Sequence, residues 1–391
     1  MNRLGILKYD LVSICLYIGL VSFGIVNIYS SSFSGSYVGL LDLSSIVGKQ
    51  VIFFFLSLVA FIFILFTRNK FIDNSVSIVY FLSIILLLGL FIFGAERGGA
   101  RSWYALGPIS FQPSELAKFG TALFLSKFLS IIQTDLKKNR DILIVLIIIL
   151  VPLILTTIQP DPGSALIFVA FIFPIIREGL NLNYFYFGLY IISTLLLTLK
   201  FNFLVSLAML IIFFLTYLIY LRNKKIKVSL LKYIFSFFIL ISISFSTNYL
   251  FENVLEQRHR DRINLVLGKE IDTSGIGYNI NQSKIALSNG GFFGTGFLEG
   301  TQTKGNFVPR QHTDFIFSTI GEEWGFIGTL TTIIIFSFLI IRIIIRADKQ
   351  PNHFRRIYSY CFASLVFFHF FLNVGMSIGL IPSIGIPLPF I

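Results

Sequence analysis

The residues best suited to chemistry stand where a polar segment meets a long apolar one. Asp314 lies at this boundary, and three polar residues come shortly before it: Arg310, Gln311 and His312. Asp314 could cap the helix that follows, a role that Thr313 could fill equally well. Capping does not explain the other polar side chains, so we expect Asp314 to be functional. A carboxylate in this position can accept the proton of a hydroxyl group.

A helix that runs on from Asp314 has one small and polar face. Ser318, Gly321 and Glu322 share that face at helical spacing. Such a stripe packs against other helices or lines a cavity rather than facing lipid. Glu322 and Glu323 lie about two turns inside the helix. They form either a buried hydrogen-bonded pair or a pair in which one acid is neutral.

A second polar segment, residues 98–118, combines a cation with an ion pair. Pro113 and Glu115 suit the first turn of a helix, and Glu115 stands three residues before Lys118 on one helical face. This pair is either a structural lock or part of a binding site. Arg101 precedes it in a loop, where a guanidinium can bind phosphate.

Two further segments are rich in proline or glycine. In residues 159–164, Asp161 stands between two prolines, which predicts a rigid turn and a helix cap. Residues 290–296 and 300–303, the latter including Gln302, resemble either a phosphate cradle or a re-entrant turn. No strand is expected before them, so they do not form a P-loop.

Long apolar segments must position these residues. The chain has 391 residues, of which 55% are hydrophobic and 13% charged, against about 25% charged in soluble domains. A membrane-spanning helix needs about 20 mainly apolar residues. We therefore predict an all-α, polytopic transmembrane helix bundle, with 164–176 as its shortest span. About eleven runs supply the spans: 11–30, 51–67, 75–94, 114–131, 142–158, 164–176, 183–199, 203–221, 230–249, 314–342 and 357–382.

Basic residues predict the orientation of this bundle. A cytoplasmic N-terminus places most Lys and Arg residues in inner loops, as the positive-inside rule requires. Residues 250–313 then form one large extracytoplasmic loop within a single integral membrane domain, residues 1–391. The net charge of +12 is explained in this way and indicates no nucleic-acid partner. Cys15 and Cys361 lie in apolar runs and offer no disulfide framework or metal site.

The polar segments also carry a resemblance to a known family. Four stretches match it: GGARSWYALG to FQPSELAKF at 98–119, QPDPGSAL at 159–166, the HTDF-containing stretch 278–328, and 373–391. The chain resembles the SEDS (shape, elongation, division and sporulation) family of bacterial membrane glycosyltransferases that polymerise peptidoglycan. The sequence GTQTKGNF before HTDF is more similar to the rod-shape branch, RodA, than to the division branch, FtsW.

The resemblance implies an activity and a set of residues. Lipid II would be polymerised into glycan strands at the outer face of the bacterial cytoplasmic (inner) membrane, and undecaprenyl pyrophosphate would leave. Asp314 matches the essential aspartate of the family and would act as the general base. Arg101, Glu115 and Lys118 match other sensitive positions. We expect six residues to bind substrate: Arg101, Glu115, Lys118, Gln302, Arg310 and His312.

Partners follow from the same resemblance. The family works with a class B penicillin-binding protein, a transpeptidase that cross-links new strands, and with other membrane proteins of the elongation complex. No cofactor is firmly implied, although a divalent cation, Mg or Mn, would assist the departing diphosphate.

The chain departs from the family pattern at three places. Residues 181–249 hold three apolar runs where one is expected, so two are extra. Arg310 stands where the family often has Glu, which keeps Asp314 ionised but weakens it as a base. The sequence stops at Ile391, where the family continues into a final span, so we expect it to be truncated or incomplete.

Two other classes of function fit the pattern less well. A lipid-linked-sugar flippase would use the polar stripe as a transport path, but it needs polar groups through the whole bilayer. A scaffold that holds a partner on the small-residue faces of 314–342 and 357–382 would tolerate the loss of Asp314. Within the family, an FtsW-like member of the division branch is the alternative.

Overall fold

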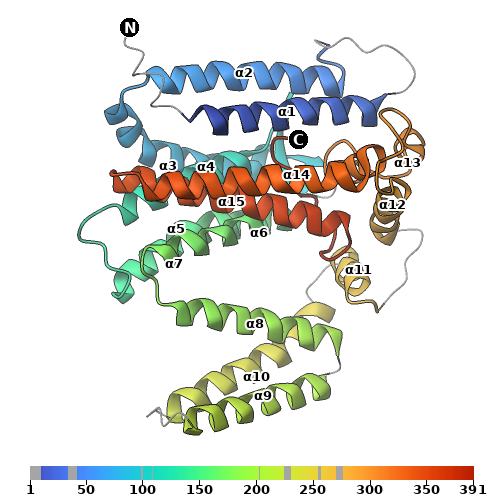
Figure 1. The fold of residues 1–391 in the computed structure, drawn as a ribbon. Helices are drawn as coiled ribbons and strands as arrows, with labels where there is room; N and C mark the ends of the chain where they lie inside the picture. Colours follow the sequence, from blue (N-terminus) through green and yellow to red (C-terminus); the bar gives the residue numbers. More distant parts are fainter. Residues whose placement is uncertain are drawn as a thin grey trace. The chain divides into compact units, whose positions relative to one another are not determined.

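The fold is built almost entirely of helices, and helical structure occupies each predicted apolar run (Figure 1). The computed structural model describes residues 10–33, 42–97, 100–107, 109–201, 203–223, 230–253, 257–269 and 276–391. The helices in the predicted runs are α1 (Leu11–Ser32), α2 (Ile46–Phe66), α3 (Asn69–Phe93), α4 (Pro113–Leu129), α5 (Asn139–Ile158), α6 (Pro162–Ile167), α7 (Ile172–Arg177), α8 (Leu182–Lys200), α9 (Phe203–Asn223), α10 (Leu230–Asn253), α14 (Ile316–Asp348) and α15 (His353–Ser377).

Several of these helices are long and apolar enough to cross a membrane. Among the described residues there are seven: α1, α2, most of α3, α5, α8, α14 and α15. The prediction of an all-α, multi-span bundle is confirmed, while the figure of about eleven spans stays a prediction. Run 164–176 is interrupted, because a 3-10 turn (Phe168–Phe171) separates α6 from α7. Pro174 in α7 has no N–H group, so a carbonyl in the preceding turn does not receive the usual α-helical hydrogen bond.

A small sheet joins α3 to α4, and the sequence analysis did not predict it. Strands β1 (Ala95–Arg97), β2 (Ala100–Leu106) and β3 (Ile109–Phe111) pair antiparallel in that order. Tyr104 of β2 lies opposite Phe111 of β3. The Tyr104 hydroxyl donates to the Leu86 carbonyl of α3 at 2.9 Å, which ties the sheet to the end of that helix.

The predicted extracytoplasmic loop also contains helices. These are α11 (Gln257–Val266), α12 (Ile276–Asn289) and the four-residue α13 (Thr301–Lys304). The Ser283 hydroxyl of α12 bonds the Ser318 hydroxyl of α14 at 2.5 Å and the Ser377 carbonyl of α15 at 2.7 Å. Much of the segment 276–313 is therefore folded against the ends of α14 and α15.

Helix α14 is broken at Gly325, where φ is 64° and ψ is −160°. The break frees carbonyl groups, and the glycine-rich segment 290–296 bonds to them. The Thr295 N–H donates to the Glu322 carbonyl at 2.9 Å, and the Gly296 N–H donates to the Glu323 carbonyl at 3.1 Å. Since these donors are occupied, the glycine-rich segment is a packing element rather than a phosphate cradle.

The chain forms two compact units. Unit 1 contains Met1–Leu180 and Asn279–Ile391, and unit 2 contains Asn181–Tyr278. In unit 2, α8 and α10 meet through a buried hydrogen bond of 2.8 Å between the hydroxyls of Thr198 and Ser244. The two extra apolar runs fall in unit 2. The expectation of one integral membrane domain over 1–391 stays a prediction.

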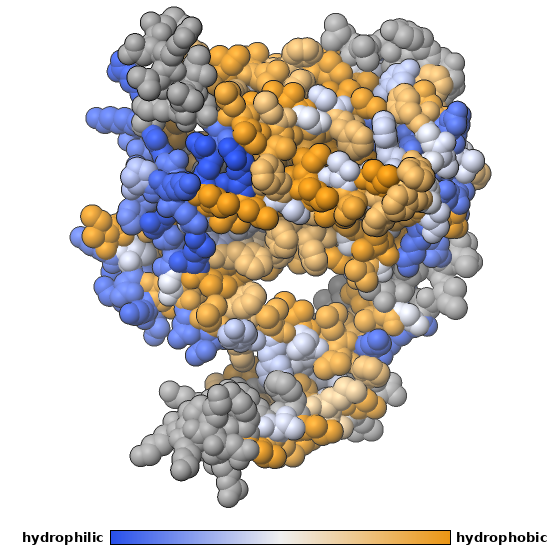
Figure 2. Space-filling view, viewed as in Figure 1, coloured by the Kyte–Doolittle hydropathy of each residue, from blue (hydrophilic) through white to orange (hydrophobic). Residues whose placement is uncertain are grey.

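Unit 1 has two chemically different ends. One end carries the sheet, α12, α13 and the start of α14. At the other end arginines pair with acids: Arg342 with Asp10, Arg177 with Asp348, and Arg356 with Glu178. Figure 2 shows one face, on which a hydrophobic band separates hydrophilic residues at the two ends of α14 and α15.

Candidate active site

Asp314 lies just before α14, under the last residues of the chain. Only 9% of Asp314 is exposed, and its Oδ2 accepts a hydrogen bond of 3.2 Å from Nη1 of Arg310. The Arg310 side chain is 63% exposed. The residue that caps α14 is Phe315, which makes no side-chain cap bond, so Asp314 does not act as the helix cap. Instead, its carboxylate is paired, at the end of unit 1, with one cation that stands on a long side chain.

The backbone around Asp314 is fixed from two sides. Asn373 of α15 donates from Nδ2 to the carbonyls of Asp314 and Ile386, each at 2.8 Å. Gly385 has φ +73°, and a Cβ at this position would lie 3.6 Å from Oδ2 of Asp314. A Cβ would fit at that distance, so it is the positive φ that favours glycine here, and the C-terminal segment covers the acid from one side.

His312 lies beside this pair and is half-buried. Burial lowers the pKa of His312 below its usual value, the nearby Asp314 charge opposes that shift, and the Arg310 charge reinforces it. The ring is therefore neutral at neutral pH. A neutral imidazole can both donate and accept a hydrogen bond, which suits the hydroxyl groups of a sugar.

A buried carboxylate, Glu322, fixes the loop before Asp314. It accepts hydrogen bonds from the backbone N–H groups of Gln302 (2.7 Å) and Thr303 (2.8 Å), and from the Thr303 hydroxyl (2.6 Å). Gln311 then donates from Nε2 to the carbonyls of Ser31 (2.8 Å) and Thr303 (2.9 Å). Glu322 and Gln311 thus tie α1, α13 and the Asp314 loop together.

A second cluster forms around Lys118. The Lys118 side chain is 5% exposed, and its Nζ lies 2.7 Å from Oε1 of Glu115 and 3.0 Å from Nε2 of His369. Because the lysine donates, Nε2 of His369 accepts, and the other ring nitrogen carries the proton that faces the Pro387 backbone. The cluster connects α4, α15 and the C-terminal segment that covers Asp314.

The proline-rich turn adjoins the same end. Asp161 caps α6, since its Oδ1 accepts from the Ser164 N–H at 3.1 Å, as predicted. Gln112 donates from Nε2 to Oδ2 of Asp161 at 2.9 Å. A Cβ on Gly163 would lie 2.5 Å from the Ile384 carbonyl, so this turn packs directly on the C-terminal segment beside Asp314.

The structure leaves Arg101, a predicted site residue, apart from both clusters. It lies exposed in strand β2. Within the described part of the chain, its guanidinium forms no ion pair and no contact with Asp314. Arg101 is therefore available to an anionic ligand at this end of unit 1.

Comparison with known proteins places the chain among bacterial cell-wall proteins. A family model described as a cell cycle protein, FtsW/RodA/SpoVE, matches residues 10–205 and 177–391. The chain belongs to this family. The resemblance recognised from the sequence is confirmed, and the chain is a multi-pass membrane protein.

Relatives of the FtsW/RodA/SpoVE family agree with this assignment. The peptidoglycan glycosyltransferase MrdB of Escherichia coli (strain K12) is 31% identical over 314 residues, covering 80% of this chain and 70% of the relative. The peptidoglycan glycosyltransferase RodA of Treponema pallidum (strain Nichols) is 29% identical over 420 residues, covering 98% of this chain and 93% of the relative.

Solved structures show the same fold. A chain from a peptidoglycan synthase complex, whose structure is described as coordinating polymerization and crosslinking, superimposes with a TM-score of 0.70 at 24% identity, covering 98% of this chain and 91% of that chain. The rod shape determining protein RodA of Thermus thermophilus superimposes with a TM-score of 0.59 at 21% identity, covering 98% and 89%.

The predicted site residues fall into separate groups in this family member. Asp314, Arg310 and His312 come together, and Glu115 pairs with Lys118. The backbone N–H of Gln302 donates to Glu322, and the role of its side chain in substrate binding stays a prediction.

Sequence reasoning missed two residues that support these groups, His369 and Asn373. Both stand inside the apolar run 357–382. Polar side chains are costly within a span, and that cost is the signal that could have found them.

Proposed function

We propose that this protein is a peptidoglycan glycosyltransferase that polymerises lipid II into glycan strands during cell elongation, as a RodA-like member of its family. The observation that carries the proposal is the Asp314 carboxylate, covered from one side and paired with the exposed Arg310 at the end of unit 1. The names of the curated relatives support the chemistry.

In the proposed reaction, Asp314 is the general base. The C4 hydroxyl oxygen of one disaccharide forms a bond to the anomeric carbon of another, and its proton passes to the Asp314 carboxylate. The bond between that anomeric carbon and the diphosphate oxygen breaks, and undecaprenyl pyrophosphate leaves with the electron pair. The family's single-displacement chemistry needs one base on the side opposite the leaving group, by analogy with inverting glycosidases.

Arg310 has a second task in this scheme. Its side chain is exposed and flexible, so it can exchange the Asp314 carboxylate for the diphosphate of a bound lipid. Binding of the substrate then removes a cation from the base and places it on the leaving group, where negative charge develops. Arg101 and His312 are the other residues we assign to substrate binding at this end.

Lys118 and Glu115 act on this site indirectly. Lys118 is buried and bonded to His369, so we assign it to positioning the C-terminal segment over Asp314 rather than to contact with phosphate. Glu115 is exposed at the start of α4, and can meet either Lys118 or a substrate group.

A divalent cation, Mg or Mn, enters the proposal only together with the substrate. The described residues contain no group of three or more His, Cys, Asp and Glu side chains that could hold a metal ion. Within the part of the chain that the structure describes, the side chains therefore do not fit a resident metal site. A cation would take most of its oxygen ligands from the diphosphate.

Orientation and partners complete the proposal. The arginine-rich end of unit 1 lies in the cytoplasm with the N-terminus, and the Asp314 end faces outward, following the positive-inside rule. We propose a class B penicillin-binding protein and other elongation-complex membrane proteins as partners. A solved structure of a peptidoglycan synthase complex that shares the fold supports the first of these.

Reconstitution tests the function directly. The full chain is placed in vesicles with its transpeptidase partner and lipid II, and glycan products are separated by length. We expect polymer from the wild-type chain and none from Asp314→Asn. Lipid II that crosses the bilayer without polymer would favour the flippase. Equal polymer from wild type and Asp314→Asn would favour a scaffold whose partner performs the synthesis.

A further inference from the structure

The arginine-rich end of unit 1 carries a groove that the proposed reaction does not use. It encloses about 360 Å³ along the last turns of α14. Its lining combines Gln350 with three apolar and three basic side chains, which are Phe338, Ile341, Ile345, Arg342, Arg346 and Lys349.

These side chains follow one another in a fixed order along the helix. Steps of three and four residues place them on one face of α14. The apolar members are well exposed, Phe338 at 47%, Ile341 at 54% and Ile345 at 49%. Arg342 lies between Ile341 and Ile345, whereas Arg346 and Lys349 lie at the helix end, where Lys349 is the C-cap. The groove therefore has an apolar floor that ends in a cationic head.

The cationic head keeps an excess of positive charge. Nη2 of Arg342 lies 2.7 Å from Oδ1 of Asp10, and Nε of Arg346 lies 3.3 Å from Oδ2 of the same carboxylate. Lys349 forms no ion pair with any residue that the structure describes. The Asp10 carboxylate pairs with two of these three cations, so two positive charges are left over at the boundary of the apolar surface.

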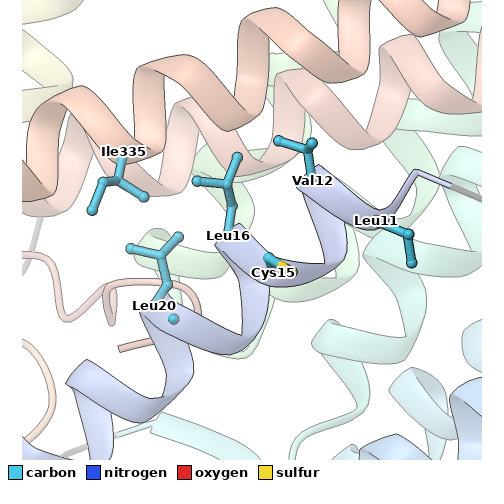
Figure 3. Close-up of a pocket in the computed structure, with 7 residues that line it drawn as sticks. Leu11, Val12, Cys15, Leu16, Leu20 and Ile335 are labelled. Carbon is cyan, nitrogen blue, oxygen red and sulfur yellow. The ribbon is translucent and has the colours of Figure 1, made fainter.

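Neighbouring hollows at this end lack that combination. The groove between α1 and α14 is lined by apolar residues and Cys15, with Leu16, Leu20 and Ile335 facing it (Figure 3). The hollow beside α7 contains Arg177 and Arg356, but Asp348 and Glu178 neutralise them. Figure 2 shows hydrophilic residues at the left-hand end of α14, directly beside the hydrophobic band.

We propose that this groove binds an anionic phospholipid of the surrounding membrane. The phosphate would lie between Arg346 and Lys349, and one acyl chain would follow Ile345, Ile341 and Phe338. Basic side chains that border a spanning helix attract anionic headgroups, each contributing roughly a fivefold increase in affinity. A free phosphate would leave the apolar floor uncovered, so the lipid satisfies both halves of the groove.

Native mass spectrometry of the delipidated full chain tests this site. Phosphatidylglycerol and phosphatidylcholine with identical acyl chains are added in equal amounts. We expect phosphatidylglycerol adducts to dominate in the wild type and to weaken about fivefold in Lys349→Gln, where the Arg342–Asp10 pair is intact. The matched control is Arg355→Gln, which removes an exposed charge at the same end but outside the groove.

Three outcomes would overturn the proposal. Equal binding of the two lipids would show that the basic side chains do not select the anionic headgroup. Equal losses of phosphatidylglycerol binding in Lys349→Gln and Arg355→Gln would show that the lipid responds to the overall positive charge of this end and not to the groove. Displacement of phosphatidylglycerol by millimolar inorganic phosphate would show an anion site that needs no acyl chain. Unchanged thermal unfolding of both variants confirms that the comparison concerns binding.

Discussion

At the residue scale, the site is organised by one carboxylate and the cation beside it. Arg310 is 3.2 Å from Asp314 and reaches far into solvent, so the ion pair is poised for exchange with an anionic ligand. Asp314 is buried, but Arg310 is largely exposed to water, which screens the pair, so we expect its contribution to stability to be modest, about 1 kcal/mol. The pair therefore matters mainly for function, and its loss should lower the turnover rate more than the free energy of unfolding.

Replacing Arg310 with glutamine tests this exchange. We expect lipid II turnover to fall about 10- to 100-fold, because a charged contact with the diphosphate is lost. Arg310→Lys should recover part of the rate, since the charge returns without the bidentate geometry. Initial rates at several lipid II concentrations check this, and an unchanged rate in Arg310→Gln would remove Arg310 from the scheme.

The neutral state of His312 gives a pH prediction. Its pKa lies below the usual 6.5, so the folded protein binds fewer protons at this residue than the unfolded chain. Protonation is therefore disfavoured in the native state, and more than half of the His312 rings are neutral at the usual pKa of 6.5. We expect His312→Gln to leave the shape of the rate profile between about pH 6.5 and 8 unchanged. A change of the wild-type rate with pH in this range that is absent in His312→Gln would contradict a neutral ring.

At the element scale, the break in α14 is the central feature. Gly325 interrupts the helix, the segment 290–296 fills the break, and Glu322 anchors α13. The sequence predicted a helix here and a polar stripe along it, and both are present. It did not reveal the break, because Gly321, Gly325 and Gly328 all stand in this run and only Gly325 leaves the helical conformation. Long-range hydrogen bonds decide whether the helix breaks at Gly325, and no local sequence pattern contains them.

Two adjacent glutamates provide a matched test of this arrangement. Glu322 accepts two backbone bonds from α13, whereas Glu323 bonds the Ser30 hydroxyl and its Oε2 has no partner in the described structure. Glu322→Gln should destabilise the loop by about 1 to 3 kcal/mol, since a neutral amide replaces the carboxylate that accepts these hydrogen bonds. Glu323→Gln should cost less. Limited proteolysis within 290–313 measures the opening, and equal cleavage of both variants would refute the anchor.

Other elements show where local reasoning stops. Asp161 caps its helix as predicted, because capping depends on neighbours three residues away. The same reading of Asp314 fails, because its neighbours are Arg310, Asn373 and the C-terminal segment. The strands of the small sheet have only three, seven and three residues, too short for a period-two pattern to stand out.

At the scale of the whole molecule, unit 1 separates two kinds of chemistry. Arginine–acid pairs join α1, α7, α14 and α15 at one end, and the candidate site occupies the other. The charge pattern of the sequence predicted this division, because basic residues recur in alternate loops. It could not predict which acid meets which arginine, since Asp10 and Arg342 are far apart in the chain.

The pair of Asp10 with Arg342 gives a stability prediction. Burial would raise the pKa of Asp10, but hydrogen bonds from Arg342 and Ser13 outweigh it and lower the pKa from 3.8 to about 2. The stabilisation is therefore complete above the unfolded pKa and is lost as the pH falls toward the folded one. Asp10→Asn should cost about 1 to 2 kcal/mol between about pH 5 and 8, and the cost should shrink below about pH 4.

Thermal unfolding in detergent measures that difference. The control is Asp73→Asn, since Asp73 is exposed and makes no ion pair within the described residues. A deficit in Asp10→Asn that is the same at about pH 3 and pH 7 would show that the ion pair is not its cause.

The most direct measurement separates binding from chemistry at Asp314. Single-turnover formation of the glycosidic bond and equilibrium binding of lipid II are measured side by side for the wild-type chain and Asp314→Asn. A general base contributes to the chemical step, so we predict that the rate falls by about 100-fold or more while lipid II binding changes by no more than about threefold. Bond formation at the wild-type rate, or a loss of binding as large as the loss of rate, would contradict the assignment of Asp314 as the base.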